Sequence, residues 1–135
     1  MGIDISERMI DRARTLSIPN SEFMVADLLE FRTDRKYDAL IAFDSLWHIS
    51  GFCQAQIYER LAQLIRGGGH LLFTHGNRLS NIGEMFGETF WYSSLDVKIV
   101  RKLLEANGFD VLSSIENYVE ETTGDRELLI VAKKR

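Results

Sequence analysis

The sequence contains little cysteine and little proline. Cys53 is the only cysteine and Pro19 the only proline among 135 residues. A single thiol cannot form an internal disulfide, so we expect a protein of the cytoplasm. Neither a second thiol nor clustered histidines accompany Cys53, and the sequence therefore predicts no metal site. Pro19 marks a turn over residues 17–20.

Long apolar runs and an excess of positive charge are also missing. No apolar stretch reaches the roughly 18 residues of a membrane helix, and the first residues do not have the pattern of a secretory leader. Sixteen basic residues stand against twenty acidic ones, giving a net charge of -4, and the only basic run is at residues 133–135. We therefore expect no membrane or nucleic-acid partner, and favour small molecules or proteins.

What the sequence does contain is a hydrophobic share of 45%, enough for the core of one domain over residues 1–135. Apolar runs of strand length alternate with runs of helical periodicity, as in α/β proteins. We expect strands at residues 2–5, 22–26, 37–43, 70–74, 109–115 and 127–132, and helices at about 7–16 and 54–65 and between Ser93 and Gly108.

Turn and capping residues refine this order. The glycines at 67–69 are expected to end the second helix, and Ser93 with Asp96 resembles a capping box that opens the third. The segment 76–92 has the composition of a loop over a pocket, with room for a short helix at about 81–86. No helix separates the last two strands, so they should pair as an antiparallel hairpin.

Acidic residues follow the first three expected strands. Asp4, Asp27 and Asp44 each stand where a strand ends. A carboxylate at the end of a strand can accept two hydrogen bonds from the vicinal diol of a ribose, as in nucleotide-binding α/β proteins. The alternative for Asp4 is a carboxylate that favours the start of a helix, and for Asp27 a cap on the following turn.

This order of elements and strand ends resembles the Rossmann-like class I methyltransferases that use S-adenosylmethionine. The resemblance covers almost the whole chain and rests on six short motifs, at residues 2–6, 26–28, 37–41, 44–49, 64–69 and 103–109. It implies an α/β fold with a mostly parallel sheet, helices on both faces and an antiparallel strand from the C-terminal hairpin. The family's strand order is 3-2-1-4-5-7-6.

The resemblance also implies a cofactor site for S-adenosylmethionine. Asp4 would bind the ribose hydroxyls, with Ile5 against the adenine. Asp27 would accept a hydrogen bond from the adenine amino group, and the backbone amide of Leu28 would meet a ring nitrogen. Asp44, beside the methionine part, would make a polar contact to cofactor or substrate.

His48 is the candidate catalytic residue, as a substrate-side contact or as a base, and His75 is a weaker candidate. Each follows or ends a buried strand, so the alternative is a histidine that packs in the core. We expect Trp91 and Tyr92 to pack against the last helix rather than to form a cage around a substrate.

The chain departs from the family at its beginning, where the first strand and the Gly-x-Gly-x-Gly turn have no counterpart. An uncovered strand edge at the centre of a sheet is a template for pairing with another chain. The sequence therefore predicts a homo-oligomer, most simply a homodimer, whose interface includes residues 2–5 or 38–43.

Three functions compete at this stage. The first is methyl transfer from S-adenosylmethionine to a small molecule, which needs positioning more than a catalytic triad. The second is a non-catalytic, methyltransferase-like interaction module or a truncated product, favoured by the missing glycine turn. The third and weaker interpretation is a nicotinamide-dependent enzyme, since an acid at the family's second strand, which is Asp4 here, binds the ribose of that cofactor too.

Overall fold

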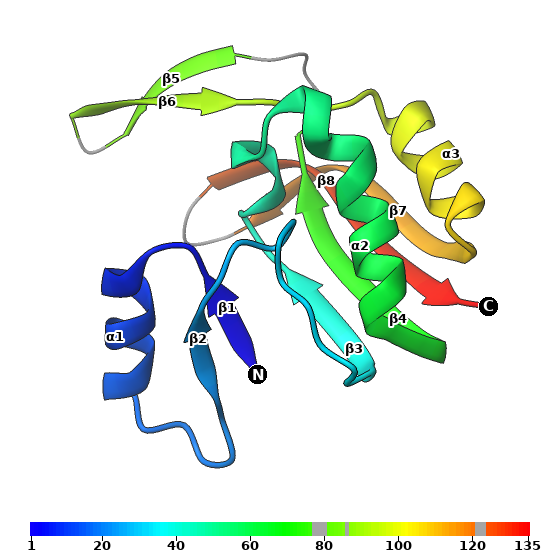
Figure 1. Cartoon of the computed structure of the whole chain (residues 1–135). Coiled ribbons are helices and arrows are strands. Elements are labelled where there is room, and N and C mark those ends of the chain that lie inside the picture. The colour runs from blue at the N-terminus through cyan, green and yellow to red at the C-terminus, as the bar shows by residue number, and fades with distance from the viewer. Residues whose placement is uncertain (77–80, 86, 121–123) are drawn as a thin grey trace. The chain divides into compact units, whose positions relative to one another are not determined.

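The computed structural model describes residues 1–76, 81–85, 87–120 and 124–135 (Figure 1). The chain divides into two compact units, Met1–Asp34 and Arg35–Arg135. A single domain over the whole chain stays a prediction. None of the helices in the described ranges is long and apolar enough to cross a membrane.

The first unit contains two short parallel strands and one helix. Strand β1 (Gly2–Asp4) pairs with β2 (Phe23–Val25), and α1 (Glu7–Thr15) connects them. Gly2 lies opposite Phe23 in this pair, and a Cβ at Gly2 would come within 2.8 Å of the Phe23 ring. Both strands and the helix were predicted from the sequence. A parallel pair of strands needs a crossover connection, and α1 provides it.

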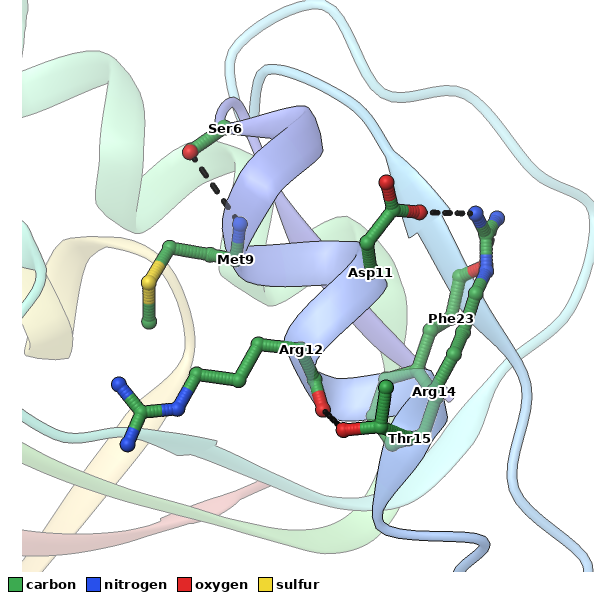
Figure 2. Close-up of polar contacts among 7 residues, drawn as sticks. All are labelled: Ser6, Met9, Asp11, Arg12, Arg14, Thr15 and Phe23. Carbon is green, nitrogen blue, oxygen red and sulfur yellow. Dashed lines mark hydrogen bonds and ion pairs between the residues drawn. The ribbon is translucent and has the colours of Figure 1, made fainter.

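Side-chain hydrogen bonds fix α1 at both ends (Figure 2). The Ser6 hydroxyl accepts from the backbone N–H of Met9 at 3.3 Å, which confirms Ser6 as the cap. Near the other end, Arg14 donates to Asp11 at 3.1 Å and to the carbonyl of Phe23 at 3.0 Å. The second contact ties the helix to β2, so the order of this unit does not depend on apolar packing alone.

The second unit is built on a mixed sheet of four strands. The described residues of this unit form the strands β3 (Tyr37–Ala42), β4 (Ile65–His75), β5 (Asn81–Met85), β6 (Glu88–Tyr92), β7 (Phe109–Glu120) and β8 (Gly124–Lys134). The helices among the same residues are the 3-10 turns η1 (Leu46–His48) and η2 (Gly51–Cys53) and the α-helices α2 (Gln54–Leu64) and α3 (Val97–Ala106). The strand order in the four-stranded sheet is β3-β4-β8-β7, with β3 parallel to β4 and the other neighbours antiparallel.

The expected α/β class is confirmed, but the expected single, mostly parallel sheet is wrong. The described strands form a parallel pair β1–β2, the mixed four-stranded sheet, and a separate hairpin of β5 and β6. In the four-stranded sheet, β7 and β8 pair antiparallel, as predicted. The order β3-β4-β8-β7 corresponds to the strands numbered 4-5-7-6 in the family's strand order.

Both α-helices of the second unit lie on the same side of the four-stranded sheet (Figure 1). The expectation of helices on both faces is therefore not met by the described part of this unit. Together α2, α3 and the sheet enclose a core of side chains that are at most 5% exposed: Ile57, Tyr58, Leu61, Leu64, Leu71, Phe73, Val100, Leu104, Phe109, Leu128, Ile130 and Ala132.

Tyr58 carries the one ionisable group in this core list. Its ring lies edge-on to Phe73 with centroids 6.0 Å apart, and burial raises the pKa of Tyr58. The unfolded chain loses this proton near pH 10, whereas the folded chain keeps it. We expect the free energy of unfolding to fall by about 1.4 kcal/mol per pH unit above pH 10 from this group. Urea unfolding of Tyr58→Phe should show a correspondingly flatter decline, and an unchanged decline would contradict the prediction.

The start of β4 differs from the expectation. Helix α2 ends at Leu64, and Ile65 is already extended, so the glycines at 67–69 lie in the strand rather than at the helix end. The pairing with β3 jumps from Tyr37↔Ile65 to Ala39↔His70, which leaves residues 66–69 as a bulge. A Cβ at Gly69 would lie 2.9 Å from the Asp38 carbonyl oxygen and 2.6 Å from Ile65.

Gly69→Ala should therefore destabilise the protein by about 1 to 3 kcal/mol, because the backbone of β3 must move to admit the methyl group. Gly67→Ala is the matched control, since a Cβ there would meet its nearest atom at an ordinary 3.5 Å. Urea unfolding measures both variants. Equal midpoints for the two would contradict the close approach at Gly69.

A β-hairpin replaces the loop or short helix expected in segment 76–92. Strands β5 and β6 pair antiparallel, and Gly87 at the turn has a φ of 79°. In β6 the side chains alternate, so Phe90 and Tyr92 lie half-buried on one face while Trp91 is 67% exposed on the other. Residues 77–80 and 86 lie outside the described part.

The cap of α3 is Asp96 rather than Ser93. The Asp96 carboxylate accepts from the backbone N–H of Lys98 at 2.7 Å, which places it directly before the helix. The predicted end is confirmed: α3 ends at Ala106, and Gly108, two residues later, has a φ of 80°. Ser93 instead donates its backbone N–H to the carbonyl of Trp47 at 2.7 Å, and so connects the end of β6 to η1.

Candidate functional site

Asp4 and Asp27 lie at the same edge of the β1–β2 pair. The N–H of Ala26 donates to the Asp4 carbonyl at 2.9 Å, so the two strands end side by side. Each carboxylate accepts from the backbone N–H two residues on, Asp4 from Ser6 and Asp27 from Leu29, both at 2.8 Å. These local bonds fix both carboxylates in orientation, and both side chains remain exposed.

The two apolar residues predicted beside these acids differ in exposure. Ile5 is 74% exposed, which is unusual for a large aliphatic side chain after a strand, whereas Leu28 is half-buried. The backbone turns at Asp27, whose carbonyl accepts from the N–H of Phe31 at 2.7 Å. The first unit thus presents two oriented carboxylates and an exposed apolar side chain that follows one of them.

Asp44 in the second unit is held by Thr74, which sequence reasoning missed. The backbone N–H of Asp44 donates to the Thr74 hydroxyl at 2.8 Å, and that hydroxyl donates to the Asp44 carboxylate at 3.1 Å. Thr74 is fully buried near the end of β4, and Asp44 is exposed with a φ of 50°. Aspartate adopts this left-handed conformation more readily than most residues, and the two bonds with Thr74 hold it there.

His48 lies among aromatic rings from two elements. The indole N–H of Trp47 donates to Nε2 of His48 at 3.1 Å. The His48 ring centroid is 5.9 Å from that of Phe90 and 5.2 Å from that of Tyr92, both in β6. The expectation that Trp91 and Tyr92 pack on the last helix is therefore wrong, because alternation along β6 turns Tyr92 toward η1 and leaves Trp91 exposed.

Gln54 is a second residue that the sequence did not reveal. Its side chain is fully buried at the start of α2, and its amide N–H groups donate to the carbonyls of Ile49 and Ser93. The bond to Ile49 is 3.3 Å long. Gln54 thereby joins the segment after η1 to the segment after β6. The one signal of this role in the sequence is that Gln54 is a polar residue on the helix face that otherwise carries Ile57 and Leu61.

His75 and Cys53 do not contribute to an exposed site. His75 is 1% exposed, with its Nδ1 at 2.6 Å from the carbonyl oxygen of Gly76 and its ring beside Phe73. It packs in the core, as the alternative interpretation held. Cys53 is a free, half-buried thiol. Among the described residues, no group of histidines, cysteines and acids could hold a metal ion.

Comparison with known proteins decides the family. A family described as a methyltransferase domain matches residues 1–69, which is more than half of the chain. The chain belongs to this methyltransferase family. The matched range contains Asp4, Asp27, Asp44 and His48. No curated protein sequence matches the chain.

Solved structures of methyltransferases share the fold at low sequence identity. A SAM-dependent methyltransferase from Methanosarcina mazei has a TM-score of 0.82 at 20% identity, over 98% of this chain and 80% of that one. N-methyltransferase NodS from Bradyrhizobium japonicum, in complex with S-adenosylhomocysteine, gives 0.72 at 19% identity, over 98% and 64%. The 1,6-didemethyltoxoflavin-N1-methyltransferase of Burkholderia thailandensis gives 0.70 at 16%, over 98% and 59%. This class I methyltransferase fold was the one that the sequence motifs predicted.

Proposed function

We propose that this methyltransferase-family chain binds S-adenosylmethionine through Asp4 and Asp27 and serves methyl transfer to a small molecule. The observation that carries the proposal is the pair of exposed carboxylates at one edge of the β1–β2 pair. Each is oriented by a backbone N–H at 2.8 Å. The family's solved structures with S-adenosylhomocysteine support this choice of cofactor.

The residues present suit the nucleoside part of that cofactor. A carboxylate oriented through one oxygen can accept hydrogen bonds from a ribose diol, the role we give Asp4. Asp27 accepts from the adenine amino group, and the backbone N–H of Leu28 donates to a ring nitrogen. The exposed side chain of Ile5 supplies an apolar surface for the adenine ring.

In the second unit, His48 and Asp44 are the groups that we expect to contact ligand. When bound, the cofactor supplies an electrophilic methyl group: the acceptor's lone pair forms the new bond while the carbon–sulfur bond breaks and its electron pair stays on sulfur. Such a displacement depends on alignment of the acceptor. Thr74 fixes the Asp44 carboxylate, and Trp47 fixes the His48 ring, so both groups are held before any ligand arrives.

Amide NMR tests the cofactor site residue by residue. Adding S-adenosylhomocysteine to the ¹⁵N-labelled chain should shift the backbone signals of residues 4–6 and 27–29. Signals of the exposed helical residues Asp11 and Arg14 serve as internal controls. Unchanged spectra at millimolar ligand would refute the proposal.

A second role, pairing with another copy of the chain, is favoured by the place of β3 at one end of the four-stranded sheet, as the described strands order it. Strand β3 is the last strand on its side of that sheet, and Ile41 in it is 71% exposed. Exposed strand edges favour pairing between chains. We expect light scattering at micromolar concentration to show a dimer that Ile41→Lys weakens. A wild-type monomer would contradict this.

A further inference from the structure

Four aromatic side chains form one surface in the second unit, which we call the aromatic patch: Trp47, His48, Phe90 and Tyr92. His48 is the shared member, with ring centroids 6.3, 5.9 and 5.2 Å from Trp47, Phe90 and Tyr92. Its ring is exposed, whereas the other three are half-buried. The patch thus presents an exposed imidazole supported by the edges and faces of three aromatic rings.

Hydrogen bonds and close packing hold the two elements of the patch together. The Ser93 N–H donates to the Trp47 carbonyl at 2.7 Å, directly connecting the residue after Tyr92 to η1. The buried Gln54 amide bridges the segments that follow η1 and β6. Tyr92 lies across Gly83 of the neighbouring strand, where a Cβ would come within 2.9 Å of its ring. The patch is therefore preorganised for a ligand.

The contact with Trp47 also assigns the tautomer of His48. An indole N–H can only donate, so Nε2 of His48 must be the acceptor at 3.1 Å. The proton of the neutral ring then lies on Nδ1. In this state the Nε2 lone pair is occupied, and Nδ1–H can donate to a ligand. His48 is arranged as a hydrogen-bond donor, which differs from the general base expected of a catalytic histidine.

We propose that the aromatic patch binds the methyl acceptor, and that this acceptor is a planar aromatic or heteroaromatic molecule whose ring atom or substituent accepts a hydrogen bond from His48 Nδ1–H. The proposal rests on the methyltransferase function given above. Flat ligands suit the patch because aromatic rings stack or meet edge to face. A proton that the acceptor loses during transfer goes to water, since His48 keeps its own. Trp47 is a positioning residue that acts through His48.

The tautomer is tested first, on the full chain without cofactor. Long-range ¹H–¹⁵N NMR distinguishes the two neutral forms of histidine, and His48→Gln identifies the His48 signals among the three histidines. We expect the Nδ1–H form in the wild type and a mixture of forms in Trp47→Phe. Trp91→Phe, which removes an exposed indole, is the control and should keep the wild-type form. An Nε2–H form in the wild type would overturn the proposal.

Ligand binding is tested with quinoline-6-carboxylate and 2-naphthoate, which differ by one ring nitrogen. Titration followed by NMR should show that the wild type binds the quinoline about tenfold more tightly than 2-naphthoate. One hydrogen bond to a neutral donor contributes about this factor in affinity. His48→Phe should remove that preference and retain 2-naphthoate binding. Tyr92→Leu should weaken both ligands about tenfold, and the matched Tyr92→Phe should not. Equal affinities in the wild type, or no effect of Tyr92→Leu, would overturn the proposal.

These outcomes are separate from those of the cofactor experiment. Loss of S-adenosylhomocysteine binding together with retained preference for the quinoline would defeat the proposed function and remove the methyl-acceptor assignment. Cofactor binding with no quinoline preference would defeat only the inference about the aromatic patch.

Discussion

Asp4→Asn should lower the affinity for S-adenosylhomocysteine about ten- to a hundredfold, since a lost charged hydrogen bond costs roughly 1.5 to 3 kcal/mol. The asparagine side chain keeps one carbonyl oxygen, which can still accept from the Ser6 N–H and hold the turn. The substitution therefore removes the charge and one acceptor for the ribose diol while it leaves the fold of the first unit intact. Calorimetry measures the change.

Asp11→Asn is the matched control for this experiment. Asp11 is an exposed acid of the same unit that pairs with Arg14 on the surface of α1. Surface pairs of this kind contribute little to stability. We expect the control to bind like the wild type. If Asp4→Asn also binds like the wild type, Asp4 does not hold the ribose.

Gln54→Ala should reduce the free energy of unfolding by about 2 to 5 kcal/mol. The Gln54 amide group is the donor to the carbonyls of Ile49 and Ser93, and its side chain is fully buried. Each of these half-buried carbonyls left without its donor costs about 1 to 3 kcal/mol. Because both Trp47 and Trp91 belong to the second unit, tryptophan fluorescence in urea follows the unfolding of this unit.

Gln63→Ala, on the same helix, is the control for Gln54→Ala. Gln63 is exposed, and its amide bonds to the surface side chains of Arg60 and Glu59. We expect a change within about 0.5 kcal/mol for this variant. A similar loss of unfolding free energy in both variants would show that Gln54 acts through helix propensity rather than by joining the segments after η1 and β6.

Local patterns were enough to predict the elements and the strand-end acids. Ser6 before an amphipathic helix and the apolar run at 37–43 each specify their structure within a few residues, and the structure confirms both. The acids Asp4 and Asp27 follow short strands, so their positions at a sheet edge followed from the order of elements. These features need no knowledge of distant contacts.

The features that were missed depend on residues far apart in the sequence. Thr74 holds Asp44 across 30 positions, and Gln54 reaches Ser93 across 39. The bulge at Gly69 arises because two strands approach closely, and the hairpin of β5 and β6 becomes a partner of η1 through Tyr92. A run of glycines or aromatics does not reveal which neighbour it will meet.

The split of the sheet has a similar origin. Composition and order predicted the described strands except β5 and β6, and the family order predicted that β8 lies between β4 and β7. Whether two strands far apart in the sequence pair depends on hydrogen bonds between their backbones, and every residue except proline offers the same backbone donor and acceptor. The sequence could therefore predict the pairs β1–β2 and β3–β4 as parallel neighbours, but not the number of sheets.

Calorimetry of the wild-type chain with S-adenosylmethionine, S-adenosylhomocysteine and adenosine tests the central claim, that Asp4 and Asp27 form a nucleoside site. The contacts assigned to these residues all reach the adenosine part, which the three ligands share. We therefore expect weak binding with about equal affinity for all three. A strong preference for S-adenosylmethionine would show that further groups bind its methionine part, and would support methyl transfer. The absence of binding of all three ligands at millimolar concentration would contradict the account.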